Sequence, residues 1–147
     1  MDSIRVIGRD NARTPMQWDE SNNAGFSTGQ PWLAVNPNYQ EINVQEALAN
    51  PDSIFYTYQK LVQIRKENSW LIRADFELLD TADKIFAYIR KDGDRRFLVV
   101  ANLSNEKQNF SVEGRVKSIL IENTTAKEAV EKQTLAPWDA FCVELTD

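Results

Sequence analysis

Apolar and polar residues alternate with a period of two along the second half of the chain, from about Trp70 to the end. This alternation is typical of β-strands that bury one face. Turn residues separate the segments, and the Asp-Gly pair within Lys91–Asp94 favours a tight hairpin because glycine tolerates a positive φ. Short strands separated in this way are typical of an antiparallel sandwich. The predicted strands are FELLD, KIFAYIRK, RRFLVVANLS, QNFSVEG, RVKSILIEN and WDAFCVEL.

The core of this sandwich is predicted to come from one face of each strand. The alternation alone leaves open which face points inward, because a shift of one residue moves every side chain to the other face. The candidates for much of the core are Phe86, Tyr88, Leu98, Val100, Ile119, Ile121, Phe141 and Val143.

A helix is predicted just before the strands, over residues 53–67, and a shorter one, NVQEALAN, before it. The apolar residues of the longer segment recur at the spacing that places them on one helical face. This stripe consists of Ile54, Tyr58, Leu61 and Val62.

Residues 8–44 follow neither period and are rich in asparagine and proline. A structureless stretch of this length is uncommon inside a compact domain, unless it is a functional loop packed against another part of the protein. The pattern therefore predicts two domains. Residues 1–68 would be an incomplete part of a domain whose remainder lies outside this chain, and residues 69–147 would form the β-sandwich.

Composition narrows the function classes. The 147 residues are 42% hydrophobic and 27% charged, as in a soluble globular protein. The net charge of −5 argues against nucleic acid as a partner, and no apolar run is long enough to cross a membrane. The chain has no histidine, which excludes Ser-His and Cys-His nucleophiles and disfavours zinc. No metal-binding residue and no cofactor are expected. One cysteine, Cys142, and a start without a signal-peptide pattern lead us to expect a cytoplasmic location.

The irregular stretch carries a recognisable string of motifs. RDNARTPMQWD is followed by AGFS, PW, VNPNY, INV and DSIFYTYQKL. This string resembles the segment near the end of the catalytic barrel in α-glucosidases of glycoside hydrolase family 13, in the group of oligo-1,6-glucosidases, dextran glucosidases and trehalose-6-phosphate hydrolases. IFAYIRK and the closing LAPWDAFCVEL extend the resemblance over essentially the whole chain.

The resemblance implies a fold and an activity. Residues 1–68 would be the last loop and helix of a (β/α)₈ barrel, followed by the C-terminal antiparallel β-sandwich of the α-amylase superfamily. The complete enzyme would remove terminal α-1,6-linked glucose from isomalto-oligosaccharides or dextran by a retaining mechanism, with trehalose-6-phosphate hydrolysis as the alternative. Its catalytic carboxylates would lie upstream of Met1, so this chain alone would be inactive. Three acidic residues here are not expected to replace them: Asp10, Asp19 and Glu20.

Arg9 is the one residue that the resemblance assigns to substrate binding. It matches the arginine of an Arg-Asp motif that hydrogen-bonds the hydroxyls of the terminal glucose, which makes such enzymes exo-acting. A guanidinium offers a rigid fork of donors that suits neighbouring hydroxyls. The family often has serine before this arginine, whereas this chain has Gly8. The alternative is that Arg9 is a structural arginine paired with Asp10. Three other residues are expected to brace the loop: Asn11, Arg13 and Asp19.

Exposed aromatic rings can stack on sugars, but packing is the favoured interpretation for the tryptophans. Met16 and Trp18 are expected to anchor the loop by packing. The same preference for a core or interface position holds for Trp32, Trp70 and Trp138. Two further alternatives stay open at this point. One is a carbohydrate-binding module, which needs a row of exposed aromatic residues that the strands do not clearly show, and the other is a purely structural domain.

Overall fold

The computed structural model describes residues 9–146, apart from the side chains of Arg9 and Asn11. The chain divides into two compact units, Met1–Lys60 and Leu61–Asp147, and the boundary falls inside helix α3 (Ile54–Glu67). Among the described residues, no helix is long and apolar enough to cross a membrane.

The described part of the first unit contains short helices and no strand. Asn43 begins α2 because its side-chain oxygen accepts a hydrogen bond from the backbone N–H of Glu46 at 2.9 Å, as an N-cap does. The short helix predicted from NVQEALAN is thereby confirmed. The elements are the 3₁₀ helices η1 (Arg9–Ala12), η2 (Asn22–Gly25) and η3 (Pro37–Gln40), then α2 (Val44–Ala49) and the start of α3.

Helix α3 confirms the longer predicted helix, but its apolar stripe is not buried. Tyr58 in the middle of the stripe is 68% exposed, and none of the described residues of α3 is buried. An amphipathic helix normally buries such a stripe against another part of the protein, because most of the stability of helices in proteins comes from packing of the apolar face.

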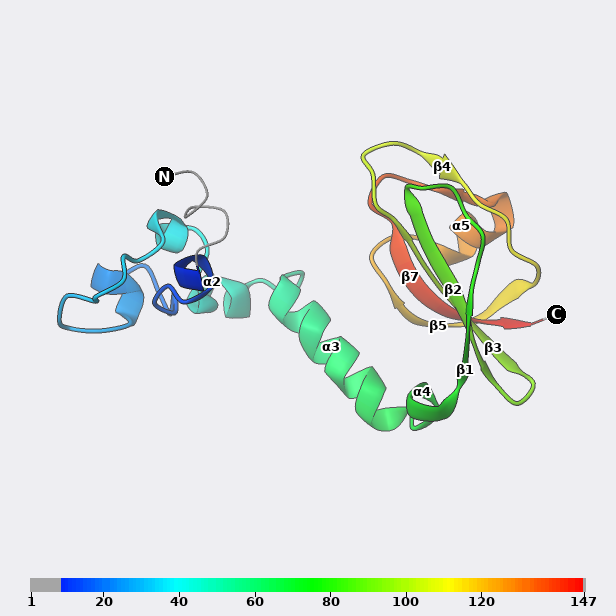
Figure 1. Cartoon of the computed structure of the whole chain (residues 1–147), viewed down its shortest axis with the longest axis horizontal. Coiled ribbons are helices and arrows are strands. Elements are labelled where there is room, and N and C mark those ends of the chain that lie inside the picture. Colours follow the sequence, from blue (N-terminus) through cyan, green and yellow to red (C-terminus); the bar gives the residue numbers. More distant parts are fainter. Residues whose placement is uncertain (1–8, 147) are drawn as a thin grey trace. The chain divides into compact units, whose positions relative to one another are not determined.

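In the second unit, the short helix α4 (Trp70–Arg73) precedes a five-stranded antiparallel sheet (Figure 1). A two-stranded sheet and helix α5 (Ala126–Lys132) complete the unit, and α5 contacts β5 and β7. The mainly β, antiparallel fold predicted from the alternation is thus confirmed. The strands of the large sheet, in spatial order, are β1 (Asp75–Leu78), β2 (Ile85–Asp92), β3 (Arg95–Asn102), β7 (Ala140–Thr146) and β5 (Arg115–Glu122), and the small sheet pairs β4 (Gln108–Asn109) with β6 (Thr134–Leu135).

The core lies between the large sheet and the layer formed by α5, β4 and β6. Four of the predicted core residues belong to it, namely Leu98, Val100, Phe141 and Val143. The other residues of the cluster come from β2, α5, β6, β7 and the segment after β4. They are Ile85, Ala87, Ile89, Phe110, Val112, Ala126, Ala129, Val130, Leu135 and Leu145.

The other four core candidates were wrong. On β2 the odd-numbered residues, such as Ala87, face the core, so Phe86 is 48% exposed and Tyr88 is only half-buried. On β5, Ile119 is exposed and Ile121 half-buried, and register shifts beside Ile119 interrupt the alternation. The period was therefore correct, but the face could not be chosen without knowing where α5 packs.

The sheet face opposite the core is called the outer face here. Its apolar residues include Phe76, Leu78, Phe86, Tyr88, Val99, Ile121 and Cys142, as the strand register shows. The ring of Tyr88 lies 5.0 Å from that of Phe76 and 5.6 Å from that of Phe86, measured between centroids. The sequence did not reveal this group of aromatic residues because they come from two strands. Their rings are tilted against one another, so they form an apolar surface rather than one flat platform.

Helix α4 is fixed to one end of this face. Trp70 stacks on Phe97 with ring centroids 3.7 Å apart. The guanidinium of Arg90 donates hydrogen bonds to the carbonyl oxygens of Leu71 and Ala74, at 3.0 and 2.7 Å. The packing position expected for Trp70 is confirmed.

Candidate functional site

The loop that holds Arg9 begins with the helix η1 (Arg9–Ala12). The side chains of Arg9 and Asn11 lie outside the described residues, so the substrate-binding assignment of Arg9 stays a prediction, as does the loop-bracing role of Asn11. The structure does place Arg13 beside Asp10, with an ion pair between the guanidinium and the carboxylate. Asp10 therefore has a partner other than Arg9. The ion pair links Arg13, directly after η1, to the first turn of this helix.

Asp19 braces the next part of the loop. Its carboxylate accepts hydrogen bonds from the side-chain hydroxyl and the backbone N–H of Ser21, and these lower the pKa of Asp19. The same carboxylate lies so close to Gly25 that an added Cβ would sit 2.6 Å from it. Gly25 also has φ +66°, so no other residue fits this position without strain. These contacts agree with a structural role for Asp19.

The backbone of the loop is tied to helix α2. The N–H of Val44 donates to the carbonyl oxygen of Gln17 at 2.9 Å, and the N–H of Gln45 donates to that of Trp18 at 3.0 Å. The N–H of Trp18 donates to the carbonyl oxygen of Ala24 at 2.9 Å. The loop thus has a defined path, although the side chain of Trp18 and that of Met16 remain about half exposed.

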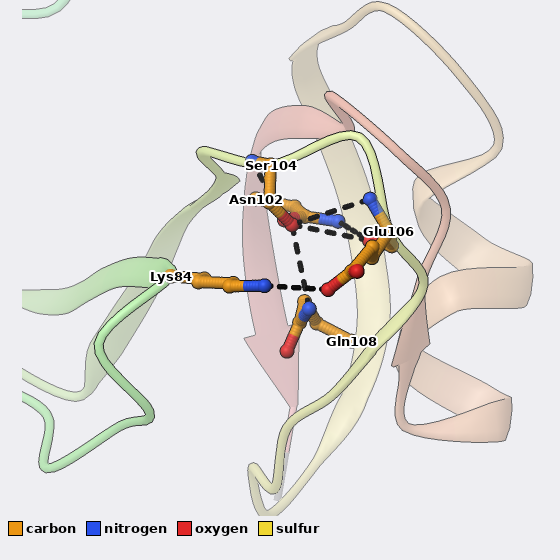
Figure 2. A network of polar contacts seen from close by, with 5 residues as sticks. All are labelled: Lys84, Asn102, Ser104, Glu106 and Gln108. Atoms are coloured by element: carbon orange, nitrogen blue, oxygen red, sulfur yellow. Dashed lines mark hydrogen bonds and ion pairs between the residues drawn. The ribbon is translucent and has the colours of Figure 1, made fainter.

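A second polar group, which the sequence analysis missed, lies at one end of the sandwich. Figure 2 shows the side chains of Lys84, Asn102, Ser104, Glu106 and Gln108 meeting there. Asn102 is 2% exposed, and its amide donates to the carbonyl oxygens of Glu106 and Ala136, at 2.7 and 2.8 Å. Its side-chain oxygen accepts from the N–H and the hydroxyl of Ser104. The sequence signal was an Asn-x-Ser run that begins at the last residue of a strand, where such side chains bond the local backbone.

Glu144 is a third candidate because it is a carboxylate on a central strand. Its side chain is 8% exposed and accepts hydrogen bonds from Arg95, Lys117 and Ser118. The hydrogen bonds from Arg95 and then Lys117 are the main reasons why the pKa of Glu144 falls to about 2. The group is therefore ionised and fully paired at neutral pH, which suits a structural role better than proton transfer.

Replacing Glu144 by glutamine is expected to lower the free energy of unfolding by about 1–2 kcal/mol at pH 7, because Arg95 and Lys117 are themselves half-exposed and partly screened. The folded-state pKa lies below the unfolded one, so the carboxylate stabilises the fold above about pH 4.5 and loses this effect as the pH falls toward 2. Urea unfolding of both proteins at pH 7 and pH 3 measures this. If the difference in unfolding free energy between the two proteins is as large at pH 3 as at pH 7, the charge of Glu144 is not its cause.

A cavity of about 240 Å³ opens between β1, β2 and the segment after β4. The charged groups around it contact one another: Lys91 pairs with Glu77 at 2.6 Å, and Arg96 donates to the carbonyl oxygen of Glu113 at 3.4 Å. Across residues 9–146, no group of three or more Asp, Glu or Cys side chains is arranged to hold a metal ion. The cavity is lined by Glu77, Leu79, Ile89, Lys91, Arg96, Ser111, Val112 and Glu113.

Comparison with known families explains the two halves of the chain. Residues 1–74 match the family model described as alpha amylase, catalytic domain, and residues 76–142 match the maltogenic amylase C-terminal domain. The chain therefore belongs to the alpha-amylase family of glycoside hydrolases, glycoside hydrolase family 13. The resemblance inferred from the loop motifs is confirmed.

Individual relatives fall within the expected group. The chain is 90% identical over 145 residues to a glucan 1,6-alpha-glucosidase of Streptococcus pneumoniae serotype 4, covering 99% of this chain and 27% of that protein. It is 45% identical over 151 residues to an oligo-1,6-glucosidase of Bacillus cereus, with the same two coverages. The crystal structure of Bacillus licheniformis trehalose-6-phosphate hydrolase (TreA) superposes with a TM-score of 0.86 at 34% identity, covering 99% of this chain and 28% of that one. The chain thus spans about a quarter of the length of these proteins.

Proposed function

We propose that this chain is the C-terminal portion of an exo-acting α-1,6-glucosidase that removes terminal glucose from isomalto-oligosaccharides or dextran. The observation that carries the proposal is the 90% identity, along nearly the whole chain, to a protein named glucan 1,6-alpha-glucosidase. In this proposal residues 1–68 complete the catalytic barrel and residues 69–147 are the C-terminal sandwich. The reaction follows the retaining mechanism of the family, with its carboxylates outside this chain.

Arg9 is proposed as the contribution of this chain to the active site. Active sites of (β/α)₈ barrels are built from the loops at the C-terminal face, which suits a polar loop before the last barrel helix. The brace from Asp10 to Arg13 and the hydrogen bonds of Asp19 support the proposal, because they give the loop a defined path beside Arg9. A contact to the terminal glucose there leaves no room for another sugar, so the enzyme acts on chain ends.

The exposed apolar surfaces support the view that a larger part of the enzyme covers this chain. The stripe on α3 and the outer face each leave large apolar side chains in solvent, with Tyr58 and Phe76 as examples. Contiguous patches of this kind on a soluble protein usually mark a contact with another domain or protein. The glucan 1,6-alpha-glucosidase and the oligo-1,6-glucosidase described above are long enough to contain such a covering part, since this chain covers only 27% of each.

Trehalose-6-phosphate hydrolysis is the alternative within the same family. It is favoured by one observation, the close superposition on the Bacillus licheniformis trehalose-6-phosphate hydrolase. The identity to that protein is 34%, against 90% to the glucan 1,6-alpha-glucosidase, so the glucosidase remains our proposal. We also propose a cytoplasmic location, which suits a chain whose single cysteine, Cys142, forms no disulfide.

The complete enzyme is expected to prefer isomaltose over trehalose 6-phosphate by about a hundredfold or more in kcat/KM. A site built to bind uncharged glucose hydroxyls leaves a phosphate dianion without partners, and unpaired polar groups produce discrimination of this size. Initial-rate measurements on both substrates test it. The reverse preference would establish the alternative, and turnover of neither substrate would refute both.

A further inference from the structure

Trp138 is an exposed aromatic residue held in an uncommon backbone conformation. It lies in the turn before β7, its side chain is 59% exposed and its φ is +62°. Few residues other than glycine and asparagine adopt this left-handed region, and a bulky side chain there deserves an explanation. Burial cannot be that explanation in this chain, because most of the indole is in solvent.

Hydrogen bonds on both sides fix the backbone of Trp138. Its N–H donates to the carbonyl oxygen of Ser104 at 3.1 Å, and its carbonyl oxygen accepts from the side-chain amide of Asn123 at 2.8 Å. Asn123 is held in turn, since its side-chain oxygen accepts from the N–H of Ala140 at 2.7 Å. The indole is therefore presented from a rigid turn.

The buried side chain of Asn102, which belongs to the polar network of Figure 2, also holds this turn. Asn102 donates to Ala136, at the start of the turn, and the N–H of Ala136 donates to the carboxylate of Asp139 at 2.7 Å. Asn102 also holds the loop of Ser104, the residue that receives the hydrogen bond from Trp138. One buried side chain thus fixes both segments that position the indole.

The surroundings of Trp138 are polar, unlike those of the aromatic residues on the outer face. The side chains of Lys84 and Glu106, paired with each other, are 51% and 63% exposed at the same end of the sandwich. Asn123 is also exposed there. An exposed aromatic ring at the same end of the sandwich as charged groups and an amide suits a sugar, because the C–H face of a sugar packs on a ring while its hydroxyls bond to polar side chains.

Trp138 also lies at the end of the sheet that is distant from α4. Asp75, directly after α4 and its C-cap, pairs with Lys91 at one end, whereas Ala101 pairs with Ala140 at the other, next to Trp138. Helix α4 therefore connects to the sheet at the opposite end from Trp138. This position leaves the indole away from that junction.

We infer that Trp138 is a stacking platform for a glucose unit of an α-1,6-glucan, in addition to the contact that Arg9 is proposed to make with the terminal glucose. The inference rests on the proposed function for the choice of sugar. A second contact on a long glucan keeps its chain ends at a raised local concentration, which helps an enzyme that acts only on ends. Isomaltose, with two glucose units, would gain nothing from it.

A cyclic isomalto-oligosaccharide tests the platform, because it has no chain end and cannot enter an exo-acting site. The complete enzyme and its variants Trp138→Gly and Trp138→Phe are titrated with it by calorimetry. The wild type and Trp138→Phe should bind, and Trp138→Gly should bind about two- to tenfold more weakly, as expected for one stacked ring. Glycine adopts φ +62° without strain, so Trp138→Gly should melt no lower than the wild type and should keep its kcat/KM on isomaltose.

Three results would overturn the inference: no binding of the cyclic glucan by the wild type, equal binding by Trp138→Gly, or a lower melting temperature of Trp138→Gly together with slower isomaltose hydrolysis. The last result would identify Trp138 as a packing residue at an interface. Failure of the proposed function is a different outcome, since it would appear as wild-type enzyme that does not hydrolyse isomaltose, whatever the cyclic glucan does.

Discussion

Replacing Arg9 by alanine in the complete enzyme is expected to lower kcat/KM on isomaltose by about ten- to a few-hundred-fold. The proposed contact is a pair of hydrogen bonds from a charged donor to the hydroxyls of the terminal glucose. Such a bond typically contributes about 1.5–3 kcal/mol, and each 1.4 kcal/mol corresponds to a factor of ten in rate. The loss should appear in kcat/KM, because the contact holds the sugar through the transition state.

Two variants separate substrate binding from loop structure. Arg9→Lys should restore only part of the activity, since an ammonium group lacks the planar fork of the guanidinium. Arg13→Ala is the matched control, because it removes the exposed ion pair with Asp10. It should lower the melting temperature slightly, by the equivalent of about 0.2–1 kcal/mol, and reduce activity less than Arg9→Ala.

These comparisons need kcat/KM and a melting curve for each variant. Unchanged kcat/KM in Arg9→Ala would remove this residue from the active site. A large fall in the melting temperature of Arg9→Ala would instead assign Arg9 the alternative role of a structural arginine in the loop.

The positions of most strands along the chain were readable from the sequence because hydrophobic alternation and turn residues are local. β2, β3, β5 and β7 all lie within one or two residues of the segments predicted for them. The inward face was not readable, since Ala87 rather than Phe86 faces α5, and only tertiary packing decides between them. This is why half of the core candidates lie on the outer face or between the bulges of β5.

Helix α5 was missed although its pattern was present. Ala126, Ala129 and Val130 are its buried residues, and their spacing places them on one helical face. The segment is only seven residues long and sits between two predicted strands, so the two-residue period of its neighbours obscured it.

The candidate functional residues also differ in whether the sequence could reveal them. Arg9 could be proposed from the sequence because a long motif string surrounds it. Trp138 could not, because its left-handed backbone is held by hydrogen bonds with Ser104 and Asn123, which are distant in sequence, and its exposure depends on the tertiary fold. A tryptophan within alternating residues normally predicts a packed position, and only the turn geometry separates it from Trp70.

The chain alone is expected to hydrolyse no glucoside, which is the largest effect predicted here. A retaining glycosidase needs two carboxyl groups about 5 Å apart, one of them with a raised pKa so that it can donate a proton. Within residues 9–146, each carboxyl group whose pKa departs from its ordinary range has it lowered, chiefly by hydrogen bonds from neighbouring side chains. These groups are Asp19, Glu77, Glu106, Glu128 and Glu144.

The most direct measurement is therefore an activity assay on the purified chain, alone and together with the upstream part of the enzyme produced as a separate polypeptide. Isomaltose and p-nitrophenyl α-glucoside are the substrates. We predict no turnover above the blank for the chain alone or for the upstream part alone, and turnover when both are present. Turnover by the chain alone that persists through repurification would contradict it, because the catalytic carboxylates would then have to lie within these 147 residues.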